Sequence, residues 1–212
     1  MSKNDYPRSS VLVPALALLV LVAGAPAGLA QTPVVSGAAT ALQASVTVLG
    51  QTTTTALGAT GPLANDGDAR NAALPTGSIA SVGGANVLHA TAVSAITNWI
   101  AGDSVASDAA VADLSLGVGG SAVTASFVMA QADTPLGGAS TVRTAVEDLT
   151  VDGVPIAATG AENQTVSLPG LTLVLNQVQR TGGSITVTAL RVTSADGLVD
   201  VAVASASSGI GP

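Results

Sequence analysis

Histidine, cysteine and lysine, which most often carry nucleophilic and acid–base chemistry, are nearly missing from this chain. Its 212 residues include one histidine, His89, one lysine, Lys3, and no cysteine. A Ser-His-Asp triad would have to use His89, and the Gly-x-Ser-x-Gly pattern of a nucleophile elbow does not occur. His89 stands in the alternating segment Val-Leu-His-Ala-Thr, where we expect a surface position. The sequence therefore favours a protein without a catalytic site, and we assign no catalytic residue.

Carboxylates are the remaining groups that could do chemistry. A glycosidase needs two of them about 5–10 Å apart, and sugar sites often add aromatic rings, but Trp99 and Phe127 are the only rings after residue 30. We expect both rings in the core and interpret most carboxylates as solvated turn residues. A carbohydrate-active enzyme or polysaccharide-binding protein that uses surface carboxylates is the alternative. The clusters are Asp103, Asp108 and Asp113, and Glu147, Asp148 and Asp152.

One acidic, glycine-containing segment could bind a metal. Asn65, Asp66 and Asp68 surround Gly67, and oxygen ligands in such a loop suit calcium. The segment lacks the spacing and the distal glutamate of an EF-hand, so we interpret it as an ordinary type I or I′ turn. Calcium at Asn65, Asp66 and Asp68 is the alternative, and no other cofactor is expected.

The composition excludes several classes of protein. The formal net charge is −7, and only 9% of the residues are charged, against about 25% in an average globular protein. An acidic chain of this kind does not bind nucleic acid, and without cysteine it is neither a disulfide scaffold nor a Cys-ligated zinc domain. Valine, leucine and isoleucine are too frequent for a disordered chain.

The first 30 residues have the layout of a secretory signal peptide. Lys3 and Arg8 precede an apolar run over residues 11–23, and small residues lead up to Ala30. The run is shorter than the roughly 20 residues that a spanning helix needs. We therefore predict a signal-peptide helix that is cleaved before Gln31, and a membrane contact limited to export.

Turn dipeptides set the register of the predicted hairpins. A two-residue turn at Gly119-Gly120 pairs Leu116 with Val123 and puts the apolar residues of both strands on one face. By the same alternation Phe127 faces the core. A turn at Asp152-Gly153 pairs Val151 with Val154.

The C-terminal part predicts a three-stranded meander. Turns at Gly182-Gly183 and Asp196-Gly197 give the rungs Leu173–Val192–Val201 and Leu175–Leu190–Val203. We therefore predict an all-β fold, an antiparallel β-sandwich built from hairpins, with a β-solenoid as the alternative. Residues 58–86 are rich in turn formers, and we expect loops between short strands there. The predicted organisation is a signal peptide (1–30), a linker or an irregular strand leading into the domain (31–41), one all-β domain (42–208) and a tail (209–212).

The chain resembles the bacterial choice-of-anchor P family. The resemblance rests on residues 90–93, 113–125, 166–177 and 185–206, which include Val-Ser-Leu-Pro-Gly and the run Ile-Thr-Val-Thr-Ala-Leu-Arg-Val. It implies an exported bacterial protein without catalytic residues. Residues 209–212 hold no Leu-Pro-x-Thr-Gly sorting sequence, which favours release over attachment to the wall. We expect a secreted or cell-surface structural or adhesive module with a cell-wall or extracellular partner.

Overall fold

A computed structural model describes residues 34–64, 67–80 and 87–211, all within the unit Thr32–Pro212 into which the chain divides after Gln31. The predicted signal-peptide helix lies outside these residues. The described part contains strands and no helix, which confirms the all-β prediction. Six strands form the first antiparallel sheet, in the order β10 (Gln164–Leu168), β11 (Leu171–Thr181), β12 (Ser184–Ser194), β13 (Val199–Gly211), β1 (Val34–Val48) and β2 (Gln51–Ala59).

The second sheet is also antiparallel and holds the other seven strands. Its order is β3 (Ala69–Ala80), β4 (Val87–Ile100), β5 (Ser104–Val118), β6 (Ser121–Pro135), β8 (Thr150–Val151) and β9 (Val154–Pro155), with β7 (Thr141–Glu147) also paired to β6.

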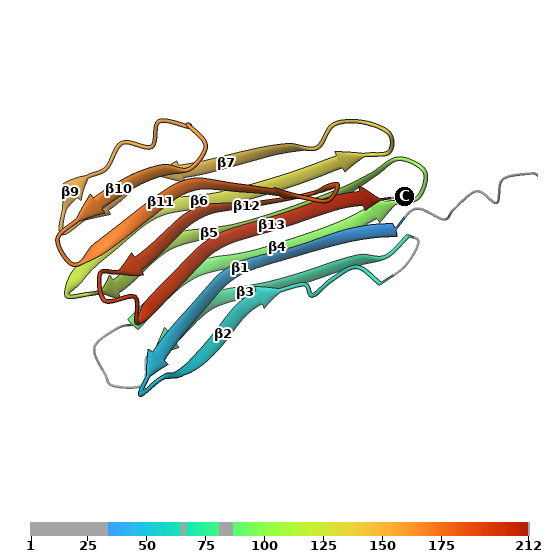
Figure 1. Ribbon diagram of the computed structural model, residues 1–212. Coiled ribbons are helices and arrows are strands. Elements are labelled where there is room, and N and C mark those ends of the chain that lie inside the picture. Colours follow the sequence, from blue (N-terminus) through green and yellow to red (C-terminus); the bar gives the residue numbers. More distant parts are fainter. Residues whose placement is uncertain (1–33, 65–66, 81–86, 212) are drawn as a thin grey trace, which may run out of the picture. The chain divides into compact units, whose positions relative to one another are not determined.

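The two sheets pack against each other as two layers (Figure 1). β13 contacts β5 and β6, β1 contacts β4 and β5, and β12 contacts β6 and β7. The residues between the layers are mainly Ala, Val and Leu, and small side chains let the sheets approach closely. A buried hydrogen bond crosses the layers between the hydroxyls of Thr134 and Ser208, whose oxygens lie 2.8 Å apart. The core is therefore mainly aliphatic, and most polar residues lie on the two outer faces.

The predicted hairpin registers are confirmed. Leu116 pairs with Val123 across the turn at Gly119-Gly120, and Val151 pairs with Val154. The C-terminal meander also has both predicted rungs, Leu173–Val192–Val201 and Leu175–Leu190–Val203. Leu190 is completely buried, because each of its two partners is also an inward-facing aliphatic residue.

The placement of Phe127 on the core face is wrong. Val123 and Ala125 face inward as predicted, but Val128 is the next fully buried residue and Phe127 is half-buried. The reason is a change of face in the middle of the strand, where the pair between Asp113 and Ser126 is missing from an otherwise regular ladder. Asp113 has a left-handed backbone (φ 48°), which shifts the alternation by one residue.

Similar face changes run across both sheets and form a line that we call the seam. In the first sheet the ladder pairs that would join residues 58, 41, 204, 189 and 176 are missing. Left-handed residues occur at Gly58, Ala92, Asp113, Asp148, Asn176 and Ala204. Because the outward-facing positions shift at matching points of neighbouring strands, outward-facing residues lie beside one another on both sides of the seam.

The ends of the domain lie in paired strands. Residues 34–41, expected to be a linker or an irregular strand leading into the domain, are part of β1, and β13 continues through residues 209–211 of the expected tail, where Gly211 pairs with Val34. The prediction of loops with short strands over residues 58–86 is also too irregular, since β3 continues from Ala69 to Ala80. β3 is an edge strand, where Pro75 removes no donor that the sheet needs.

Candidate functional site

The three aspartates predicted as a cluster around β5 are separated in the structure. Asp103 lies in the turn before β5, and Asp108 lies on the outer face of the sheet. Asp113 accepts a hydrogen bond from the Thr91 hydroxyl at 2.7 Å, beside the seam. No common cleft therefore joins the three carboxylates.

The second acidic group is part of the framework of the sheet. Asp148 accepts a hydrogen bond from the Ser126 hydroxyl at 2.7 Å, and Asp152 accepts one from the backbone N–H of Ala122 at 2.8 Å. Glu147 is exposed at the end of β7. These bonds fix the ends of neighbouring strands, as carboxylates in turns commonly do.

His89 is exposed on β4, where its strand neighbours are Ser78 of β3 and Ser115 of β5. Neither serine carries a carboxylate that could orient the His89 imidazole for acid–base catalysis. Trp99 is buried with Leu63 and Val105 in a small second cluster of the core, as expected, so its ring does not face a ligand.

Of the calcium candidates, Asn65 and Asp66 lie outside the described residues. Asp68 Oδ2 accepts hydrogen bonds from the Ala64 backbone N–H at 2.9 Å and from Arg70 Nε at 2.8 Å, and these bonds hold the pKa of Asp68 below its ordinary value. Among residues 34–64, 67–80 and 87–211 no cluster of three metal-binding side chains occurs. Calcium at this turn stays a prediction.

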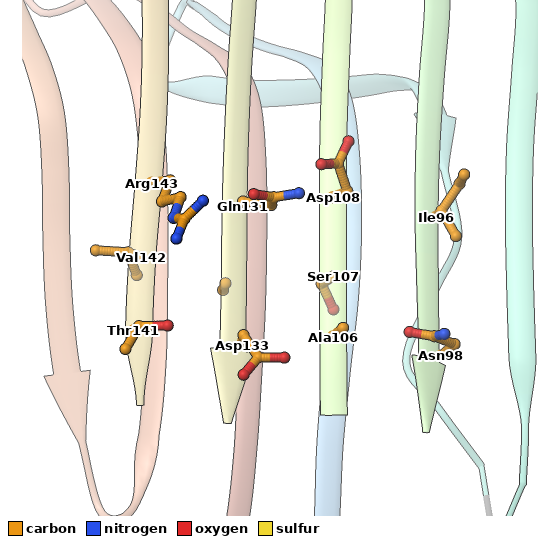
Figure 2. Close-up of a pocket in the computed structure, with 11 residues that line it drawn as sticks. Ile96, Asn98, Ala106, Ser107, Asp108, Gln131, Asp133, Thr141, Val142 and Arg143 are labelled. Atoms are coloured by element: carbon orange, nitrogen blue, oxygen red, sulfur yellow. The ribbon is translucent and has the colours of Figure 1, made fainter. Parts of the chain in front are cut away.

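The most developed site is a hollow on the outer face of the second sheet, which we call the outer hollow. It has a volume of about 340 Å³ and lies where β4 and β6 end and β5 and β7 begin (Figure 2). Its outward-facing residues alternate along each strand with buried ones such as Ser107 and Ala132. They are Ile96, Asn98, Ala106, Asp108, Gln131, Asp133, Thr141 and Arg143.

The strand registers arrange these residues in two rows. One row runs from Arg143 through Gln131 and Asp108 to Ile96. The other row runs from Thr141 through Asp133 and Ala106 to Asn98. Ala106 has the smallest side chain of the eight, so it forms the floor of the hollow between longer neighbours.

Asp108 and Gln131 face each other across neighbouring strands. Figure 2 shows Arg143 reaching from β7 toward Gln131, and Gln131 reaching toward Asp108. Partial burial raises the pKa of Asp108, and the hydrogen bond with Gln131 opposes that shift. Because desolvation dominates, the Asp108 carboxyl lies in a less hydrated environment than an ordinary surface aspartate.

The hollow can bind polar ligands, since it offers both donors and acceptors on strands that hold them in place. Its carboxylates accept hydrogen bonds, the guanidinium of Arg143 donates them, and the amides of Asn98 and Gln131 do both. It contains no nucleophile next to a base. Sequence reasoning missed the hollow, although every one of its residues lies at an outward position. The missing information was the register between β6 and β7 and the irregular register between β4 and β5.

No helix that could cross a membrane is found in the described part of the chain. Comparison of the chain with protein-family models, with curated proteins and with solved structures found no match to any of them.

Proposed function

We propose that this chain is an exported module that acts outside the cell as a structural or adhesive domain and has no catalytic site. The observation that carries the proposal is the contrast between a mainly aliphatic core and outer faces that hold most of the polar residues. Most acidic groups are engaged in turns and ion pairs that stabilise the framework. Such a molecule can present its polar outer faces to a partner.

The architecture fits the role. Two packed antiparallel sheets joined by tight turns are in our interpretation a β-sandwich and not a β-solenoid, because the strands pair as hairpins. The resemblance to choice-of-anchor P proteins favours a bacterial exported protein. We further propose that residues 1–30 are the signal peptide, since Lys3 and Arg8 precede the apolar run over residues 11–23 and small residues lead up to Ala30.

Localisation tests the proposal directly. The native protein would be followed by antibody in the cytoplasm, the membrane, the wall and the culture medium, and its N-terminus sequenced. We expect recovery from the medium or the wall with Gln31 as the first residue. Recovery from the cytoplasm or the membrane with the residues of the predicted signal peptide intact would refute export.

A carbohydrate-active enzyme is the second candidate, and one observation favours it. Asp108 and Asp133 lie diagonally across β5 and β6 in the same hollow, an arrangement that places β-carbons about 7 Å apart. Carboxyl groups on β-carbons this far apart can reach the separation of about 5–10 Å that paired glycosidase carboxylates have. Release of reducing sugar from a polysaccharide, lost in both Asp108→Asn and Asp133→Asn, would establish this function.

A further inference from the structure

We infer that the outer hollow binds an uncharged polysaccharide, so that it is the adhesive site of the proposed extracellular module. The inference rests on that proposed function and adds the ligand class and the contact residues. Four features carry it: the ion pairing of the arginines, the balance of charge, the apolar floor and the length of the hollow.

Arg143 differs from the other arginines of the described chain. Arg70, Arg180 and Arg191 each pair with a carboxylate, at N–O distances of 2.8, 2.6 and 2.6 Å. Within the described residues no carboxylate pairs with Arg143, although the chain is strongly acidic. The side chain is exposed at the hollow, so its five N–H donors remain available to a ligand.

The opposite face of the molecule provides a comparison. A hollow of about 210 Å³ there also contains an arginine, Arg191, with Gln43 and Ala202 nearby. Its guanidinium is held by both oxygens of Asp200 at 2.8 and 2.6 Å. The donors are used internally in that case, so this second hollow is part of the framework. The outer hollow keeps its donors and its Asp133 carboxylate free of such pairing.

The charges of the outer hollow select an uncharged ligand. A polyanion would be repelled by Asp108 and Asp133 and by the net charge of −7, and the unpaired Arg143 beside these carboxylates makes the hollow a mixture of donors and acceptors that suits a neutral polar ligand. A sugar hydroxyl both donates and accepts hydrogen bonds, so neighbouring hydroxyls can satisfy a carboxylate on one side and a guanidinium or amide on the other.

The apolar and geometric features agree with a polysaccharide. Ile96 is 51% exposed at one end of the hollow, where its side chain can contact the C–H face of a sugar ring, and Ala106 leaves room beneath the ring. The hollow crosses four neighbouring strands, which span about 14 Å, the length of about two or three sugar rings. Because β5 and β6 are interior strands, the polar groups are held in position before the ligand arrives.

The test is affinity electrophoresis in native gels that contain a mixed-linkage β-glucan, a galactomannan or dextran, with pectin as the anionic comparison. Ala106→Leu fills the floor of the outer hollow. Ala202→Leu is the matched control, because it makes the same change in the hollow on the opposite face. Arg143→Gln removes the unpaired charge. Circular dichroism and urea unfolding check that each variant is folded.

We expect at least one uncharged polymer to retard the wild type and Ala202→Leu equally. Ala106→Leu and Arg143→Gln should weaken binding at least about tenfold, as loss of a central contact does. Absence of retardation by all three uncharged polymers would overturn the inference, as would stronger binding to pectin or an unchanged Ala106→Leu variant. If any of these binding tests fails but the localisation experiment recovers the protein outside the cell, only the polysaccharide inference is overturned. Recovery inside the cell would refute the proposed function itself.

Discussion

Leu190 should be one of the most sensitive positions of the fold. It is completely buried on β12 between Leu175 of β11 and Val203 of β13. Leu190→Ala removes three carbon atoms, which is about 2.4 kcal/mol of transfer free energy at 0.8 kcal/mol each. The cavity left between two rigid sheets brings the expected loss of unfolding free energy to about 3–4 kcal/mol.

Thr188→Ala is the matched control on the same strand. Thr188 is 8% exposed on the outer side, and its hydroxyl lies 2.6 Å from that of Ser205. Thr188→Ala removes this hydroxyl and a γ-methyl group and should cost about 1–2 kcal/mol, since Ser205 is only partly buried and water can reach its hydroxyl.

Urea unfolding followed by circular dichroism measures both changes by linear extrapolation. Leu190→Ala should lower the midpoint by about 1–2 M without changing the slope. A loss below 1 kcal/mol, or equal losses in the two variants, would refute the reasoning. Equal losses would mean that the outer face of the meander is as buried as the inner face.

Three further predictions address chemistry, pH and turn geometry. His89→Ala should change the unfolding free energy by about 1 kcal/mol or less and leave every activity and binding signal of the wild type intact; a reproducible activity lost without unfolding would contradict this. The hydrogen-bonded guanidinium of Arg191 holds the pKa of Asp200 below its ordinary 3.8, so their ion pair stabilises the fold above that pH and the contribution disappears as the pH falls below it. The unfolding free energy of Asp200→Asn should therefore decrease less as the pH is lowered than that of the wild type. An equal decrease in both proteins would exclude the ion pair as a cause of the acid sensitivity. Gly119→Ala should lower the unfolding free energy by at least about 2 kcal/mol, because its β-carbon would lie 2.6 Å from a backbone oxygen of the β10–β11 turn. Gly120 also has a left-handed backbone but open space around it, so Gly120→Ala should cost only about 1 kcal/mol. Equal losses of stability in urea unfolding would contradict the close approach at Gly119.

Asp108 connects stability with the proposed binding site. Burial raises its pKa, so its contribution to stability is largest in the protonated form at low pH and is lost as the pH rises through the raised pKa. Asp108→Asn should therefore stabilise the fold at pH 7 while weakening the binding of polysaccharide. Urea unfolding at pH 4 and pH 7 checks the first effect, and a variant less stable than wild type at pH 7 would contradict it.

The local parts of the fold could be predicted because short-range geometry determines them. The turns at Gly119-Gly120, Gly182-Gly183 and Asp196-Gly197 allow positive φ values, and a two-residue turn leaves one register for the strands beside it. Alternating apolar residues then decide which face is buried. The burial of Leu190 and Trp99 follows from the same arithmetic of sequence.

The position of Phe127 could not be predicted from the alternation of apolar residues. Its outward position depends on the left-handed backbone at Asp113 and on a face change that neighbouring strands share. Alanine and asparagine also adopt this backbone, at Ala92, Ala204 and Asn176, and an alanine carries no local signal for it. The one-residue shift of the alternation is set by the packing of complete sheets.

The sequence by itself determined the strands, the hairpins and the near absence of histidine, cysteine and lysine chemistry, because each of these depends on residue type and short spacing. Only the tertiary structure decided which polar residues meet. Asp108, Gln131 and Arg143 come from three strands, and they share a hollow because the β5–β6 and β6–β7 registers bring them to one level. The Gly119-Gly120 turn relates Asp108 to Gln131, but no local rule relates Arg143 to Gln131 across the loop between β6 and β7, so the outer hollow forms only once the second sheet is assembled.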